Sequence, residues 1–171
     1  MKLIAVTVAS LVPALLSLIL ISGCSQQVAA PSLGFEAGVA AYGRGDYGTA
    51  LKAFRPLAEQ GNPAAQSDLG VMYEKGQAVS QDYNEAVRWY RKAADQGYAP
   101  AQFNLARMYG LGHGVPQDYA YAYMWLSLAA DDHKFEVAQK ARNALEKHMT
   151  PSQVEKAKQL AEEWKAKKTK Q

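Results

Sequence analysis

The chain of 171 residues has 19 lysines and arginines against 16 aspartates and glutamates, 49% hydrophobic residues and a single cysteine. This length and apolar content suit one folded domain and exclude a wholly disordered chain. The net charge of +3 is too small to indicate nucleic-acid binding by itself. A single cysteine excludes an internal disulfide framework and a multi-cysteine metal site.

The start of the chain predicts an export signal. Lys2 is the only charged residue before position 24, and the segment from Leu3 to Ile21 is almost wholly apolar. A short positive start followed by an apolar stretch is typical of a signal peptide. Two alternatives stay open at this point. The apolar segment could span a bilayer without cleavage, because about 20 residues suffice, and Cys24 could stand by chance near an ordinary cleavage site.

The apolar segment ends in Ile21-Ser22-Gly23-Cys24, which resembles the bacterial lipobox. The resemblance implies that residues 1–23 are removed and that Cys24 carries the lipid that anchors the protein to a membrane. By resemblance to enterobacterial lipoproteins, Ser25 implies sorting to the outer membrane, where the domain faces the periplasm.

The residues after the cysteine predict a flexible tether. Residues 24–34 have no periodicity and contain Pro31 and Gly34, which is typical of a linker. We therefore expect the folded domain to lie close to the membrane.

The rest of the chain is an internal repeat. Shifted by 36 residues, the sequence matches itself without gaps at Gln66, Leu69, Met72, Tyr73, Gly76, Val79, Gln81, Asp82, Tyr83, Ala86, Trp89, Ala93 and Ala94. A period in the mid-thirties indicates stacked helical hairpins. The spacing of Leu69, Met72 and Tyr73 predicts a helix. We expect Gly76 and Gly112 to end the first helix of their units, and Asp82 and Asp118 to cap the second.

This pattern predicts an all-α fold of about four hairpins and eight helices. The units are a shorter one at about 35–65, two full ones at about 66–101 and 102–133, and a degenerate cap at 134–164. The cap should bury one face of each of its helices: Val137, Ala138, Ala141 and Leu145 in the first, and Val154, Ala157, Leu160, Ala161 and Trp164 in the second. Thr150-Pro151-Ser152-Gln153 predicts a capping box between the two helices. A basic tail follows at 165–171.

The motif Leu69-Gly70-Val71-Met72-Tyr73 resembles the tetratricopeptide superfamily. The long glycine-containing loop, followed by the spacing of Ala86 and Trp89, resembles its Sel-one-like repeat (SLR) branch over residues 34 to about 164. The resemblance implies a right-handed α/α solenoid whose concave face binds proteins and sometimes peptidoglycan-related ligands. Ala106 replaces Gly70 in the next unit, and we expect close packing there because both residues are small.

No catalytic arrangement is present in the sequence, so we predict neither an enzyme nor a cofactor. No serine is followed three positions later by lysine, and the HExxH, G-x-S-x-G and P-loop motifs are absent. The histidines His113, His133 and His148 do not have metal-ligand spacing, so no metal site is expected. A β-lactamase-like activity stays an alternative, because some cysteine-rich relatives of the repeat have been assigned one.

Aromatic residues that recur at repeat spacing should fill equivalent packing positions; they are Trp89, Trp125, Tyr73, Tyr109, Tyr83 and Tyr119. Ligand contacts should instead come from the first helix of each hairpin, which lines the concave face in the superfamily. When the solvent-facing positions of that helix in the superfamily are transferred to this sequence, they fall on Phe35, Val39, Arg44, Ser67, Val71, Glu74, Phe103, Arg107 and Leu111. An exposed apolar strip with charged neighbours is typical of a binding site.

These observations predict an envelope lipoprotein that acts as a scaffold for unidentified protein partners and does not bind nucleic acid. Membrane contact is expected through Cys24, and cell-wall contact through the basic tail is a weaker expectation, since such runs are commonly solvated helix ends. Two alternatives remain: a binder or hydrolase of cell-wall or β-lactam compounds, and a structural assembly factor of an envelope or secretion complex.

Overall fold

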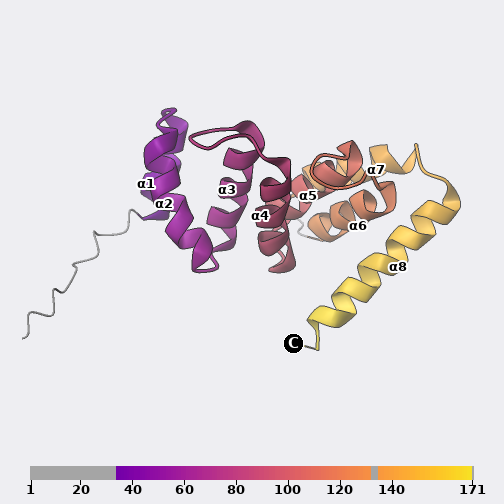
Figure 1. Ribbon diagram of the computed structural model, residues 1–171. Coiled ribbons are helices and arrows are strands. Elements are labelled where there is room, and N and C mark those ends of the chain that lie inside the picture. Colours follow the sequence, from indigo (N-terminus) through magenta and orange to yellow (C-terminus); the bar gives the residue numbers. More distant parts are fainter. Residues whose placement is uncertain (1–33, 132–134, 171) are drawn as a thin grey trace, which may run out of the picture. The chain divides into compact units, whose positions relative to one another are not determined.

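The computed structural model describes residues 34–131 and 135–170. The predicted signal peptide, Cys24, most of the tether and His133 lie outside the described residues. All regular secondary structure in the described part is helical (Figure 1), which confirms the all-α prediction. The eight helices are α1 (Phe35–Gly43), α2 (Tyr47–Glu59), α3 (Pro63–Lys75), α4 (Tyr83–Asp95), α5 (Ala99–Leu111), α6 (Tyr119–Ala130), α7 (Glu136–Glu146) and α8 (Pro151–Lys168). None of these helices is both long enough and apolar enough to span a membrane.

The helices pack as consecutive hairpins. In Figure 1, α1 lies against α2, α3 against α4 and α5 against α6, and each pair is joined to the next through α2 with α3 and α4 with α5. The last two helices depart from this order, because α7 and α8 both pack against α6 and make little contact with each other. The fourth pair is therefore an end cap over α6 rather than a regular hairpin, as terminal repeats commonly are.

Helix ends follow the predicted capping residues. The Asp82 carboxylate accepts hydrogen bonds from the backbone N–H groups of Asn84 and Glu85 at 2.9 and 3.0 Å, and Asp118 caps α6 in the same way. Such caps contribute about 1 kcal/mol each. Gly76 and Gly112 end α3 and α5 with φ of 68° and 73°, in the left-handed region that glycine favours. The Thr150 capping box is also present.

The starts of α3 and α5 define the repeat units more closely than the sequence comparison did. These helices begin at Pro63 and Ala99, three residues before the predicted unit starts at 66 and 102. The last helix also continues through Lys168, so the first residues of the predicted basic tail are helical.

The core consists of a few large side chains among many alanines. The largest fully buried side chains are Trp125, Tyr90, Phe54, Leu69, Met72, Leu105 and Met108. In the cap, Ala138, Val154, Ala157 and Ala161 are buried as expected. The expectation for Val137 is wrong, because its side chain is 48% exposed. The α7 stripe that faces the core runs through Ala138, Ala141 and Leu145, and Val137 lies about 100° around the helix from Ala138.

Close approach of the two helices of a hairpin depends on pairs of one small and one large residue. A Cβ atom built at Gly70 would lie 2.7 Å from two carbons of the Tyr90 ring, and one at Gly38 would lie 2.6 Å from the Phe54 ring. Thirty-six residues after Gly70 and Tyr90, the same positions hold Ala106 and Leu126. The methyl group of Ala106 is tolerated because leucine replaces the aromatic ring opposite.

We expect Gly70→Ala to lower the free energy of unfolding by about 1–2 kcal/mol. Overpacking against the ring costs about 1–3 kcal/mol, and the better helix propensity of alanine returns up to about 1 kcal/mol. Urea denaturation measures the loss. In the Tyr90→Leu background, which reproduces the Ala106 and Leu126 pair, the same substitution should cost nothing or stabilise. An equal loss in both backgrounds would contradict this pairing.

The long loops contact the preceding unit. The His113 ring, in the loop after α5, stacks on the Tyr83 ring at the start of α4 with centroids 4.5 Å apart. One unit earlier, the Tyr42 hydroxyl donates a hydrogen bond of 2.8 Å to Gln77 Oε1. The cap has no such loop, and Tyr119, which is equivalent to Tyr83, is 37% exposed. Tyr119 therefore keeps the contact within its unit, since Gln117 Nε2 donates to its hydroxyl at 3.3 Å as Gln81 Nε2 does to Tyr83 at 3.2 Å, but no loop in the described part of the chain stacks on its ring as His113 does on Tyr83.

The C-terminal helix α8 contacts α6 through Trp164 and Lys165, which lie at the predicted border between cap and tail. The Trp164 ring packs edge-on against Trp125 with centroids 5.8 Å apart. Lys165 Nζ lies 2.9 Å from Asp131 Oδ2 and 3.4 Å from Glu162 Oε1. One lysine of the predicted basic tail thus pairs with a carboxylate at the end of α6, but both side chains are exposed, so the Trp164 contact contributes more to holding α8 there.

Candidate functional site

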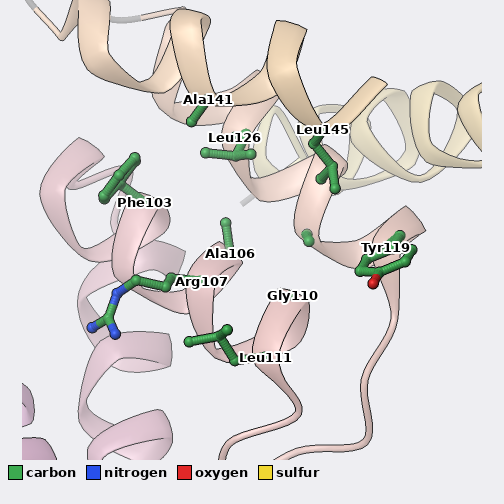
Figure 2. A pocket seen from close by; sticks show the side chains of 10 residues that line it. Phe103, Ala106, Arg107, Gly110, Leu111, Tyr119, Leu126, Ala141 and Leu145 are labelled. Carbon is green, nitrogen blue, oxygen red and sulfur yellow. The ribbon is translucent and has the colours of Figure 1, made fainter. Parts of the chain in front are cut away.

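An open pocket of about 280 Å³ lies between α5, α6 and α7. Its lining is almost entirely apolar and comprises Phe103, Ala106, Arg107, Gly110, Leu111, Tyr119, Ala122, Leu126, Ala141 and Leu145. Figure 2 shows that the guanidinium of Arg107 points away from Tyr119 and Leu145, so that mainly the carbon chain of this arginine faces the pocket. Such an apolar hollow with few polar atoms is typical of a binding site.

Three predicted binding residues meet in this pocket. Phe103, Arg107 and Leu111 follow one another along α5 at four-residue spacing, which puts them on one face of the helix. Leu111 is 53% exposed at the C-terminal end of α5. The Phe103 ring is half-buried and packs edge-on against Phe135, with centroids 5.7 Å apart.

A fourth predicted residue, Glu74, is joined to the pocket through Arg107. Glu74 Oε2 lies 2.5 Å from Arg107 Nη2 and accepts a hydrogen bond of 2.8 Å from the Tyr90 hydroxyl. Burial and the neighbouring carboxylate raise the pKa of Tyr90, so its phenol remains a donor. The Glu74 side chain is only 13% exposed, so it orients Arg107 rather than meeting a ligand.

The remaining predicted residues do not line this pocket. Phe35 packs on Phe54 within the first hairpin, with ring centroids 5.5 Å apart. Val39 and Arg44 are exposed, and Val71 is half-buried. The expectation that Ser67 faces solvent is wrong, because it is only 4% exposed. Since α3 is in contact with both α2 and α4, a side chain as short as serine is covered.

The other pocket residues were not predicted from the sequence as binding residues. Ala141 and Leu145 come from the divergent cap, where the repeat gives no register. Tyr119, Ala122 and Leu126 come from α6, the second helix of the hairpin. The sequence did contain a sign of the pocket. Gly110 stands at the position equivalent to Glu74, and Leu126 at the position equivalent to Tyr90, so both residues of the later unit have smaller side chains.

A half-buried carboxylate lies on the same helix as Glu74. Burial raises the pKa of Asp68 from 3.8 to about 6. For an acid, a folded-state pKa above the unfolded value means that the folded state binds the proton more tightly. The resulting contribution to stability is therefore lost as the pH rises from about 4 through 6.

We expect Asp68→Asn to stabilise the protein at pH 7.5 by roughly 1–2 kcal/mol, since the uncharged amide avoids most of the desolvation cost. At about pH 3, which is below both the unfolded and the folded pKa of Asp68, the difference between variant and wild type should nearly vanish. Thermal unfolding followed from about pH 3 to 7.5 measures both values. Parallel stability profiles for the two proteins would contradict the role given to this carboxylate.

The described residues contain no group of three or more His, Cys, Asp or Glu side chains that could hold a metal ion. The pocket presents apolar side chains next to Arg107, which Glu74 holds in place. These groups can bind a ligand through apolar contacts.

Comparison with known proteins identifies the repeat. The model of the Sel1 repeat matches residues 63–98 and 99–133, in agreement with the starts of α3 and α5. No curated protein sequence matches the chain significantly.

Two solved structures are similar over most of the chain. One is c5321, a protective antigen present in uropathogenic Escherichia coli strains that displays an SLR fold, with 32% identity and a TM-score of 0.72 over 75% of this chain. Another is a Sel1 repeat protein from Oxalobacter formigenes, with 34% identity and a TM-score of 0.62 over 66% of this chain. The chain covers only 28% and 46% of these two proteins. The chain therefore contains two Sel1 repeats within a helical solenoid that has the SLR fold.

Proposed function

We propose that this protein is a membrane-anchored scaffold of the bacterial envelope that binds partner proteins through the first-helix face of its solenoid, meaning the side formed by α1, α3 and α5. The observation that carries the proposal is the pocket in which Phe103, Arg107 and Leu111 converge. Sel1-repeat solenoids are typically interaction scaffolds, and a pocket lined by an aromatic residue and an arginine has the composition of interface hot spots.

The binding role is tested by crosslinking in cells. A photoreactive amino acid at position 111 should capture partner proteins, which mass spectrometry identifies. The same group at Lys158, an exposed residue of α8, serves as the matched control. The double substitution Phe103→Ala and Arg107→Ala should abolish recovery of the captured partner in a pull-down. Equal capture from positions 111 and 158, or unchanged recovery, would count against a binding role for this face.

The anchoring role rests on the lipobox and makes a separate prediction. Cys24→Ser removes the sulfur to which lipid would attach, so the protein should move from the membrane fraction to the soluble periplasmic fraction. Stable anchoring by lipid takes two or more membrane-binding signals, and a variant without the lipidated cysteine should therefore lose most of its membrane association. Retention of the variant in the membrane fraction would favour an uncleaved apolar segment.

A further inference from the structure

The neighbouring unit shows what can fill the space of the pocket. Thirty-six residues before Leu126 and Gly110, the equivalent positions hold Tyr90 and Glu74. The Tyr90 side chain is fully buried, and its hydroxyl bonds to the Glu74 carboxylate. Arg107 then covers this pair from α5. In the preceding unit, the corresponding space is therefore occupied by a phenol ring and by the carboxylate that accepts its hydrogen bond.

In the last full unit, no side chain fills the space that Tyr90 and Glu74 occupy in the preceding unit. Leu126 is shorter than tyrosine, and Gly110 has no side chain to replace the glutamate. A Cβ atom built at Gly110 would meet only Ala122 Cβ, at 4.0 Å, which is ordinary van der Waals contact. Figure 2 shows Leu126, Leu145 and Ala106 around this opening. Glycine is thus not needed there for packing, and its effect is to leave the pocket open.

The size of the pocket suits one aromatic side chain. A dry apolar cavity of roughly 150 Å³ is enough to bind benzene. The pocket has about 280 Å³ and is open on one side, so it can admit a phenylalanine or tyrosine ring together with the atoms that connect it to a backbone. Aromatic anchors in such pockets dominate the affinity of many protein interfaces.

The charges next to the pocket indicate the rest of the partner. Lys75 occupies in α3 the position that Leu111 occupies in α5, and Arg44 follows α1 at the corresponding end. Both cations are exposed, and neither belongs to an ion pair in residues 34–131 or 135–170. Of the carboxylates beside them, Glu74 is only 13% exposed and is held by Arg107, and Asp46 accepts a hydrogen bond from the backbone N–H of Thr49 as the cap of α2. A segment leaving the pocket past Leu111 therefore meets positive charge first.

We propose that this pocket binds an aromatic side chain from an acidic, extended segment of a partner protein, whose carboxylates lie toward Lys75 and Arg44. This inference rests on the proposed scaffold function and names the chemistry of the partner. Adjacent helices pack with axes about 8–10 Å apart, and an extended chain advances about 3.3–3.6 Å per residue. Acidic residues about three positions from the aromatic residue therefore reach Lys75.

The test uses a fluorescent peptide with one phenylalanine flanked by glutamates at that spacing, and fluorescence anisotropy with the purified mature protein. Gly110→Leu should fill the pocket and weaken binding at least about tenfold. Gly110→Ala, the matched control, adds only a methyl group and should bind within about twofold of wild type. Both variants should melt no lower than wild type, because both residues favour a helix more than glycine does.

The charged part of the proposal has its own readout. Lys75→Glu should weaken binding about threefold or more at low salt and much less at high salt, because exposed charges are screened. Lys158→Glu, at an exposed position of α8, is the matched charge reversal and should have no effect. A control peptide with alanine in place of phenylalanine should bind at least about tenfold more weakly.

The proposal is overturned if the peptide does not bind, if it binds folded Gly110→Leu as tightly as wild type, or if the alanine peptide binds equally well. A failure of the wider scaffold function would be recognised by a different result. If position 111 still captures proteins in cells while the peptide fails, scaffolding stands and the aromatic-acidic specificity is wrong. If position 111 captures nothing, both are wrong.

Discussion

Gly114→Ala is expected to lower the free energy of unfolding by about 3 kcal/mol. Gly114 has a φ of +69°, and a Cβ atom there would lie 2.3 Å from the carbonyl oxygen of Tyr83. Backbone atoms at the start of α4 cannot move aside as a flexible side chain can. A left-handed non-glycine residue costs about 1–3 kcal/mol, and the overpacking adds about 1–3 kcal/mol. Urea denaturation followed by circular dichroism measures the loss.

The chain contains a matched control for this prediction. Ala78 stands at the equivalent position one unit earlier, is exposed, and adopts a φ of 58° although it is not glycine. Ala78→Gly should therefore be neutral or stabilise by up to about 1 kcal/mol. The contrast between the two sites separates the backbone conformation, which they share, from the close approach of Tyr83, which only Gly114 has. A loss below about 1 kcal/mol for Gly114→Ala would show that the loop relaxes away from α4.

Trp125→Ala should cost about 4 kcal/mol, in the range found when a buried tryptophan is truncated. Its side chain is 2% exposed, and the ring joins helices from two units. The guanidinium of Arg91, on α4, lies over it at 5.9 Å, and Trp164, on α8, packs edge-on against it. The cavity left by alanine would loosen α8 as well as α6. Thermal or chemical unfolding measures the total loss, and proteolysis near the C-terminus reports the release of α8.

Trp125→Phe should cost less than half as much. The indole Nε1 of Trp125 is buried and has no hydrogen-bond partner among the described residues. Phenylalanine therefore gives up ring area and contact with Trp164 but no hydrogen bond. Equal destabilisation by phenylalanine and alanine would mean that the indole N–H has a partner in solution.

The helices and their ends could be predicted because their causes are local and repeated. Leu69 and Met72 recur 36 residues later at helical spacing and are buried in both units. The caps at Asp82 and Asp118 depend on residues only two or three positions away. The matching of Gly70 to Tyr90 involves a contact between two helices, so the sequence could indicate close packing there without showing which ring required it.

The pocket was predicted only on its α5 side. Phe103, Arg107 and Leu111 were found because the solvent-facing first-helix positions of the tetratricopeptide superfamily can be transferred to each unit of this chain. The opposite walls depend on how α7 of the divergent cap packs on α6. The cap does not match the repeat, so equivalent positions in other units do not predict this packing. The exposure of Tyr119 has the same origin, because its counterpart Tyr83 is covered by a loop that only a following full unit supplies. The burial of Ser67 was missed because the transfer of a position does not show how closely α2 and α4 cover a short side chain there.

The placement of α7 has a consequence for motion. Regular helices such as α3 and α5 each pack against two neighbours, whereas α7 packs substantially only against α6. Elements with fewer partners open at lower free energy and exchange their amide hydrogens sooner. Because α7 supplies Ala141 and Leu145, the aperture of the pocket is set by the least restrained of the helices that line it. The width of the entrance can therefore fluctuate while the three preceding hairpins keep their packing.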